Sequence, residues 1–249
     1  MPDQVAVYGS LVRQLGKLAR PFLVRGVDTI EEIRRRRPDF DGLRDEIRAA
    51  GTDSLAHFAN GYTLEGGLSL QQNPDEFAAL TLLLEERGPH AIYLEIGSAS
   101  GGACLFLYRR LGFTTVLAID DGGHVRASEQ LANFAQIPVL RRFTGDSHSH
   151  EAERFIRREL AEQIVSTDQR GPLEVAFIDG DHSHEGVTAD IELVTPFLRT
   201  GALIILHDTK AAPGVELAWL GLCASPRFRP IAEYIGREVP LGIGVAERM

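Results

Sequence analysis

VAFIDGDHSHEGV (residues 175–187) and LIILHDT (residues 203–209) are the two stretches of sequence that decide the fold. Each is an apolar run of the kind that forms a buried strand, and each stops at an aspartate with histidines beside it. The stretch of chain between the two aspartates, Asp179 and Asp208, has the length of one strand–helix–strand unit. Because parallel strands of an open sheet end at a common crevice where ligands bind, we expect both carboxylates at one site.

The same pattern extends along the chain on both sides of this pair. Apolar runs bounded by Gly, Pro or Asp predict strands at 91–96, 114–120, 138–143, 173–178 and 201–207. The gaps between them predict helices at about 101–111, 124–135, 150–164 and 185–198. A further helix at 214–223 precedes two short strands, at 228–235 and 241–246, that can pair as an antiparallel edge. This alternation is typical of an α/β fold with a doubly wound, Rossmann-like, mostly parallel sheet.

The N-terminal part of the chain follows a different pattern. The segment at 1–50 is helical in character, and the glycine-dotted stretch at 51–67 indicates a linker or a flap. Asn73, followed by Pro74 and two acids, is typical of a helix start, and that helix is predicted to run to about Arg87. We therefore predict an N-terminal helical extension and lid at 1–70 and a main domain at 71–249.

The composition limits the class of partner. A length of 249 residues with 44% hydrophobic residues fits one large α/β domain with an appendage. The formal net charge is −9, and the charge of +2 on the segment at 1–50 leaves −11 on the rest, which argues against a nucleic-acid partner. The basic run Arg34–Arg37 is interpreted as a solvated helix face, with a phosphate or partner contact as the alternative.

Cysteine content and hydropathy indicate the compartment. The two cysteines, Cys104 and Cys223, give no disulfide framework and no thiolate metal site. No apolar run reaches the ~18 residues of a membrane-spanning helix, and no signal peptide opens the chain. We therefore expect a cytoplasmic protein without a membrane partner.

The stretch EIGSASGG (residues 95–102) follows a predicted strand and opens a helix, as a cofactor-binding turn does. A dinucleotide fingerprint has glycine at its first, third and sixth positions, and this stretch places Gly97, Ala99 and Gly102 there, a partial match. An S-adenosylmethionine turn has an acid and two spaced glycines, which Glu95, Gly97 and Gly101 supply. The acid also suits a cationic ligand that carries an amino group.

Acidic residues follow the next two predicted strands as well. Asp120 and Asp121, about 20 residues past the turn, can bind ribose hydroxyls in either cofactor class. Asp146 and Ser147 follow the third strand, where an acid can accept a hydrogen bond from an adenine amino group. Each acid alone is better explained as a helix cap or turn residue, but the order of the three at successive strand ends favours a nucleotide-like cofactor.

From Gln71 to the C-terminus the chain resembles the class I S-adenosylmethionine-dependent methyltransferases. More narrowly, it is similar to the branch of macrocin-type and mycinamicin-type sugar O-methyltransferases and cephalosporin-hydroxylase-like proteins. The resemblance rests on LEIGSASGG, AIDD, GDSHS, FIDGDHSHEGV, LIILHDT and a closing GIGV. It implies a seven-stranded sheet whose last strand is antiparallel, and methyl transfer to a hydroxyl of a sugar or natural product. The cofactor contacts it implies are Glu95, Gly97, Ser98, Ser100, Gly101, Asp120, Asp121, Asp146, Ser147 and Asp179.

A metal site is suggested by Asp179, His207 and Asp208, which close two adjacent predicted strands. Carboxylate oxygens suit Mg²⁺, whereas an imidazole ligand favours Mn²⁺, Fe²⁺ or Zn²⁺. In the resembling enzymes a Mg²⁺ at this place binds the acceptor hydroxyls. Those enzymes usually carry a second acid or an Asp-Asn pair where this chain has His207-Asp208, so the use of a metal stays open.

The reaction also needs a base, because the acceptor hydroxyl loses its proton as the new C–O bond forms. His182 is the first candidate, since imidazole titrates near neutrality and the mycinamicin-type enzymes use a histidine at the matching position. Asp181 is the second candidate. The alternative is structural, with His182 capping the next helix and Asp181 in a turn. His148, His150 and His184 are interpreted as surface or rim residues.

Three other functions stay open at this point. A NAD(P)-dependent oxidoreductase would use the same sheet, and a hydroxylase could bind iron through a histidine and a carboxylate. A non-catalytic, cofactor-binding or scaffold relative would keep the fold without the chemistry. For the methyltransferase we predict a small-molecule hydroxyl acceptor and a homo-oligomer, a dimer with the N-terminal helices at its interface.

Overall fold

The computed structural model describes residues 27–51, 67–124, 127–161, 171–237 and 239–249. Two helices, α2 (Ile30–Arg36) and α3 (Phe40–Ala49), precede α5 (Pro74–Arg87). The alternating part comprises β1 (Ile92–Ile96), α6 (Gly102–Leu111), β2 (Thr115–Asp120), α7 (Ala127–Phe134), β3 (Leu140–Thr144), α8 (His150–Leu160), β4 (Leu173–Ile178), α9 (His184–Val194) and β5 (Leu198–His207). A 3₁₀ turn (Thr195–Phe197) separates α9 from β5, and the chain closes with α10 (Pro213–Ala224), β6 (Phe228–Tyr234) and β7 (Ile243–Arg248).

The strands form one seven-stranded sheet in the order β3-β2-β1-β4-β5-β7-β6. The pairs from β3 to β5 are parallel, and β7 is antiparallel to both of its neighbours. The predicted doubly wound sheet with an antiparallel last strand is therefore confirmed. The first three strands are added from β1 toward one edge of the sheet, and the later strands are added from β4 toward the other edge. The boundary between β1 and β4 is therefore the topological switch point, where a ligand crevice is expected.

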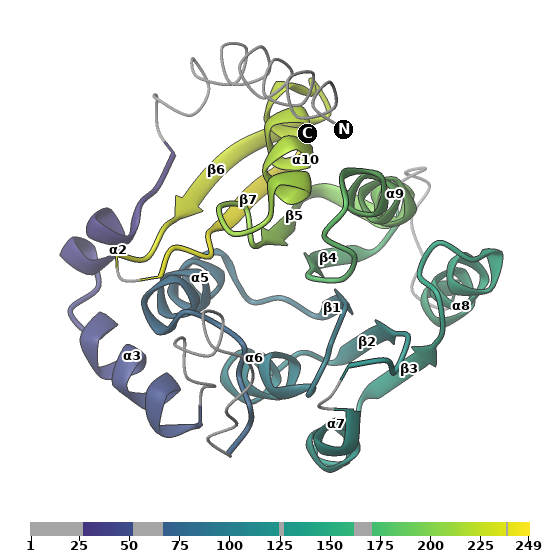
Figure 1. The fold of residues 1–249 in the computed structure, drawn as a ribbon, viewed down its shortest axis with the longest axis horizontal. Helices are drawn as coiled ribbons and strands as arrows, with labels where there is room; N and C mark the ends of the chain where they lie inside the picture. The colour runs from purple at the N-terminus through teal and green to yellow at the C-terminus, as the bar shows by residue number, and fades with distance from the viewer. Residues whose placement is uncertain (1–26, 52–66, 125–126, 162–170, 238) are drawn as a thin grey trace, which may run out of the picture.

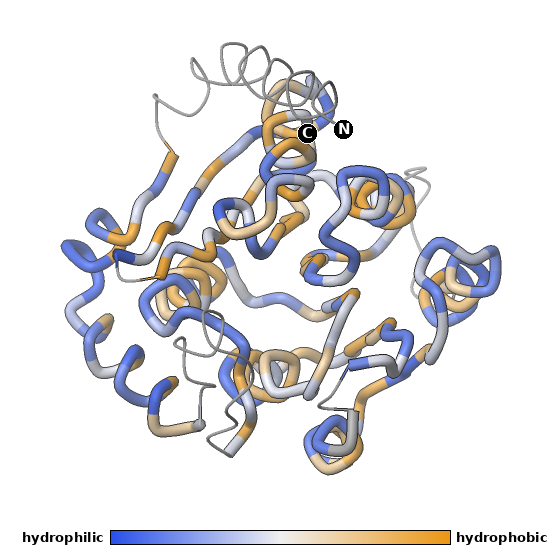
Figure 2. Tube along the Cα trace, in the orientation of Figure 1, coloured by the Kyte–Doolittle hydropathy of each residue, from blue (hydrophilic) through white to orange (hydrophobic). Residues whose placement is uncertain are grey.

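Helices cover both faces of the sheet (Figure 1). The helices α5, α6 and α7 lie on one face, and α8, α9 and α10 lie on the other. Each strand supplies both layers, because successive side chains point to opposite faces. Tyr93, Val175 and Phe177 belong to the first hydrophobic layer, and Leu94 and Ala176 to the second. The central parallel strands β1, β2 and β4 therefore read as nearly continuous apolar runs. Hydrophilic residues lie on the outward turns of helices such as α3 and α8 (Figure 2).

The helices α2 and α3 pack onto the first layer beside α5. They bury Ile33, Phe40 and Ile47 in the same hydrophobic cluster as residues of α5. The basic run is paired rather than merely solvated: Arg34 contacts Asp75 at 2.9 Å and Arg37 contacts Glu85 at 2.6 Å. The predicted division at residue 70 stays a prediction, and most of the predicted lid, residues 52–66, lies outside the described residues.

Two further expectations concern segments of the chain. The helix predicted to reach 164 is described only as far as Ala161. Among the described residues, no helix combines the length and apolar character that a membrane span requires.

Candidate active site

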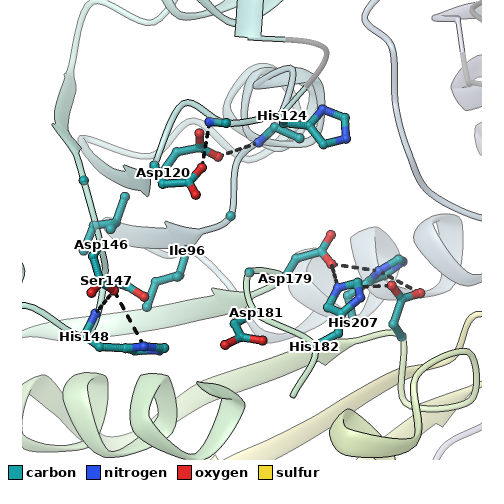
Figure 3. A pocket seen from close by; sticks show the side chains of 18 of the residues that line it. Ile96, Asp120, His124, Asp146, Ser147, His148, Asp179, Asp181, His182 and His207 are labelled. Atoms are coloured by element: carbon teal, nitrogen blue, oxygen red, sulfur yellow. Dashed lines mark hydrogen bonds and ion pairs between the residues drawn. The ribbon is translucent and has the colours of Figure 1, made fainter. Parts of the chain in front are cut away.

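A cavity of about 660 Å³ opens at the carboxyl ends of the parallel strands, over the switch point between β1 and β4. Figure 3 shows Asp146, Ser147 and His148 on one side of it and the Asp179, His182 and His207 cluster on the other. The cavity therefore brings together the ends of β2, β3, β4 and β5, as the sequence predicts for acids at successive strand ends.

The turn after β1 is built on Gly97, which has a φ of 82°. A Cβ atom at this position would lie 2.1 Å from the carbonyl oxygen of Asp179, so only glycine allows the end of β1 to approach the end of β4. Gly101 and Gly102 serve packing: a Cβ on Gly101 would meet the Phe134 ring at 2.7 Å, and one on Gly102 the Leu68 carbonyl at 2.1 Å. Gly97 lines the cavity, whereas Gly101 and Gly102 do not.

Three other predicted cofactor residues of this turn also lie outside the cavity wall. Glu95 is 2% exposed, accepts a hydrogen bond from the Tyr93 hydroxyl, and burial raises its pKa to about 8. Ser98 is buried. Ser100 is buried as well, and its hydroxyl donates to the Ser69 carbonyl at 2.9 Å, so it fastens the turn to the segment before α5. These contacts are structural within the described chain.

The acids after β2 and β3 do line the cavity. Asp120 accepts hydrogen bonds from the backbone N–H groups of Ala99 at 2.9 Å and Gly122 at 2.8 Å, so its carboxylate is fixed beside the β1 turn. Asp121 is exposed and accepts from Gly123 N at 2.7 Å. Asp146 accepts from His148 N at 2.9 Å. A ligand that lies along this wall would meet carboxylate acceptors held in place by backbone N–H groups and suited to hydroxyl and amino donors.

The opposite wall holds a compact group of two carboxylates and two imidazoles. His182 Nε2 lies 3.6 Å from Asp179 Oδ1 and 3.4 Å from Asp208 Oδ2. His207 Nδ1 lies 3.1 Å from Asp179 Oδ1 and 3.3 Å from Asp208 Oδ1 (Figure 3). His207 is 3% exposed, whereas the His182 side chain is 46% exposed. His182 is therefore the imidazole that an acceptor in the cavity can reach.

The electrostatics of this group follow from its pairing. The hydrogen bond with Asp179 raises the pKa of His182, although burial opposes the shift. Burial lowers the pKa of His207, but the charges of Asp179 and Asp208 outweigh it and raise that pKa well above the usual value. Burial would raise the pKa of Asp179, and the two imidazoles lower it well below its usual range. The carboxylates thus stabilise protonated imidazole.

Three of these side chains fit a divalent ion. One donor atom each from Asp179, His182 and Asp208 lies within 4.8 Å of the others. Asp208 Oδ1 is buried, with His207 Nδ1 at 3.3 Å beside it. Asp208 also has a φ of 61°, a strained backbone conformation at the end of β5. Two carboxylates and an imidazole suit Mg²⁺, Mn²⁺ or Fe²⁺. His207, predicted as the third ligand, is buried and is not one of these three donors.

Asp181 lies at the cavity rim but faces its own turn. Its Oδ1 accepts from Ser183 N at 2.8 Å, and this hydrogen bond lowers the pKa of Asp181. The Ser183 hydroxyl in turn accepts from Gly186 N at 3.0 Å and caps α9. The cap of α9 is thus Ser183 rather than His182, and a turn contact engages the Asp181 carboxylate.

Sequence reasoning predicted a lid before α5 but assigned no site contact to the two glutamines that end this segment. Gln71 lines the cavity, and Gln72 donates from Nε2 to Asp179 Oδ2 at 3.3 Å. Gln72 is 2% exposed, and the Asn73 cap places it, since the Asn73 side chain accepts from the N–H groups of Asp75 and Glu76. Glutamines beside a helix cap carry no chemical signature, so only their place next to Asn73 could have indicated them.

Comparisons with known proteins agree with this geometry. Residues 94–209 match the family model of a methyltransferase domain. An O-methyltransferase from Bacillus cereus, solved in complex with SAH, is similar with a TM-score of 0.55 and 19% identity, over 84% of this chain and 91% of that chain. A putative O-methyltransferase from Klebsiella pneumoniae is similar with a TM-score of 0.51 and 17% identity, over 85% and 90% of the two chains.

A further relative comes from a virus. An uncharacterized protein of Acanthamoeba polyphaga mimivirus is 24% identical over 150 residues, or 60% of this chain. The match spans 61% of the length of that relative. At these identities the solved structures support the fold, and the domain match supports the class of chemistry.

Proposed function

We propose that this chain, whose residues 94–209 match the family model of a methyltransferase domain, uses S-adenosylmethionine to methylate a hydroxyl oxygen of a small molecule. The observation that carries the proposal is the cavity between β1 and β4. Its wall after β2 and β3 offers fixed acceptors for a nucleoside, and its opposite wall offers the imidazole and carboxylates that hydroxyl chemistry requires. A dinucleotide cofactor would account for the acids after β2 and β3 but would leave the imidazole and carboxylates of the opposite wall without a role.

The cofactor residues we propose are those that line the cavity. Asp120 and Asp121 would accept hydrogen bonds from the ribose hydroxyls, and Asp146 with Ser147 would hold the adenine; all four line the cavity. The tight turn at Gly97 brings the end of β1 close to Asp179, and these residues would hold the methionine end of the cofactor. S-adenosylmethionine supplies an activated methyl group on sulfur when it is bound. The buried Glu95 would act on the cofactor through its position beneath the turn rather than by direct contact.

The transfer is an in-line displacement. The acceptor oxygen would bond to the methyl carbon as the carbon–sulfur bond breaks, and the imidazole of His182 would accept the hydroxyl proton. Asp179 and Asp208 raise the pKa of His182 and stabilise the imidazolium that forms. A general base contributes roughly 10²–10⁴-fold to such a rate, and alignment of the two reactants in one cavity contributes more. Asp181 is the second candidate base.

A divalent ion would have a defined place in this proposal. Asp179 and Asp208 would hold it, with His182 or the buried His207 as the third ligand. The ion would act as a Lewis acid toward the acceptor hydroxyl. An imidazole bound to the ion cannot accept the proton, so His182 serves as either ligand or base in one turnover. Mg²⁺ and Mn²⁺ are the ions to test first.

From the family resemblance we expect the acceptor to be a hydroxyl on a sugar or another natural product. We also expect a homodimer, and the cysteine content and hydropathy of the chain lead us to expect a cytoplasmic location. Light scattering on the purified protein tests the dimer, and a panel of glycosylated and polyketide alcohols tests the acceptor class.

A calorimetric titration with S-adenosylhomocysteine, with NAD⁺ as the control ligand, tests the proposed function directly. Micromolar binding of S-adenosylhomocysteine with no response to NAD⁺ is the expected result. Binding of NAD⁺ instead would assign the turn at Gly97 to a dinucleotide and overturn the mechanism. Tight S-adenosylhomocysteine binding without transfer to any acceptor of the panel would favour a non-catalytic relative.

A further inference from the structure

Asp190 is a buried carboxylate that the proposed mechanism does not use. It lies on α9, its side chain is fully buried, and no hydrogen bond of ordinary geometry reaches either oxygen from the described residues. A carboxylate at this depth is unfavourable unless a charged partner faces it. Burial raises the pKa of Asp190 to about 6, and the nearby Ser147 and His148 oppose that shift.

His148 is the partner that faces it. The imidazole Nε2 lies 3.3 Å from Asp190 Oδ1 and 3.2 Å from the Gly186 carbonyl oxygen, both on α9. Its Nδ1 lies 3.6 Å from Asp146 Oδ1. Both ring nitrogens therefore lie near acceptors, and the imidazole spans from α9 to Asp146 in the turn between β3 and α8.

That turn forms part of the cavity wall. Asp146, Ser147 and His148 all line the cavity, and the backbone N–H of His148 donates to Asp146 Oδ1 at 2.9 Å. Oδ1 of Asp146 thus accepts from the backbone of His148 and lies 3.6 Å from the imidazole Nδ1, which leaves Oδ2 for a ligand. A shift of the imidazole would move the acceptor that faces the cavity.

We propose that Asp190 and His148 form a positioning pair that fixes Asp146 and thereby sets how well the cavity recognises the adenine amino group of the cofactor. The inference rests on the proposed function, because it requires an adenosine ligand. It assigns His148 a role inside the cavity, where the sequence predicted a surface or rim residue. Asp190 acts through His148 and does not touch the ligand.

The test compares two ligands by calorimetry. S-adenosylhomocysteine carries the amino group, and S-inosylhomocysteine carries an oxygen in its place. For Asp190→Asn and for His148→Phe we expect S-adenosylhomocysteine to bind about tenfold more weakly and S-inosylhomocysteine to bind nearly as in the wild type, because a charge-assisted contact to the amino group is lost. The double variant should be no weaker than either single variant, since the two residues act as one unit.

The matched control is Glu192→Gln, which removes a carboxylate charge from the same helix at an exposed site paired with Arg227. It should leave both affinities unchanged. If the two single variants lose affinity for both ligands equally, the role is merely structural and the inference is overturned. It is also overturned if neither affinity changes. If Asp190→Asn does not fold, as judged by circular dichroism, His148→Phe decides alone. A wild-type protein that binds neither ligand would overturn the proposed function itself, and the inference with it.

Discussion

His182 Nε2 lies 3.4 Å from Asp208 Oδ2, so the side chain best placed to take the acceptor proton also belongs to the group that fits a metal ion. The two roles predict different behaviour. As a base, His182 is needed for the chemical step alone, and as a ligand it is also needed for metal affinity.

Replacement of His182 by alanine should therefore lower kcat by roughly 10²–10⁴-fold while the affinity for S-adenosylhomocysteine stays within a factor of two or so. Steady-state kinetics and calorimetry measure the two quantities. His150→Ala is the matched control, because His150 is exposed on α8 and does not line the cavity. Full activity in His182→Ala would shift the base to Asp181.

Asp208 should control metal affinity. Because its carboxylate is one of three donors in the group, Asp208→Asn should weaken Mn²⁺ binding by at least about tenfold, measured by titration of chelator-treated protein. Asp181→Asn serves as the control, since that carboxylate is engaged in the turn before α9. An unchanged Mn²⁺ affinity in Asp208→Asn would remove the metal from the proposal, as would activity that survives the chelator in full.

The centre of the sheet could be predicted from the sequence because β1, β2 and β4 are buried on both faces. Such strands read as apolar runs that end at Gly or Asp, and β1, β2 and β4 begin and end within one residue of their predicted limits. The acids at the strand ends could be predicted for the same reason, since topology places them at one edge. The helix start at Asn73 was predicted from local capping chemistry, which depends only on neighbouring residues.

Contacts between distant segments could not be predicted. Gln72 meets Asp179, and His148 meets Asp190, although long stretches of chain separate the members of each pair, and neither pair has a local signature. Nor does a sequence distinguish a glycine that admits a ligand from one that admits a neighbouring side chain. Gly101 is the example, since the Phe134 ring occupies the space beside it.

Gly97 should tolerate no side chain. Gly97→Ala would place a Cβ 2.1 Å from the Asp179 carbonyl in a left-handed conformation, so we expect a loss of several kcal/mol in the free energy of unfolding, or no folded protein. Gly112→Ala is the matched control. Gly112 has a φ of 69° with nothing within 4 Å of its Cβ position, so only the conformational penalty of about 1 kcal/mol applies. Equal losses in a urea titration would contradict the close approach of β1 and β4.

Glu95 should make stability depend on pH. Burial raises its pKa from 4.5 to about 8, so the folded state binds a proton that the unfolded state releases between these values. Its contribution is therefore fully present below about pH 4.5 and is lost as the pH rises toward 8, at up to about 1.4 kcal/mol per pH unit.

Glu95→Gln removes this pH-dependent contribution to stability and keeps the shape of the side chain. The free energy of unfolding of the variant, from urea titrations at pH 5 to 8, should fall less steeply with pH than that of the wild type. Glu46→Gln, on the exposed side of α3, should follow the wild-type slope. Parallel slopes for Glu95→Gln and the wild type would mean that Glu95 is ionised in the folded protein, and it would then be available to a cationic cofactor after all.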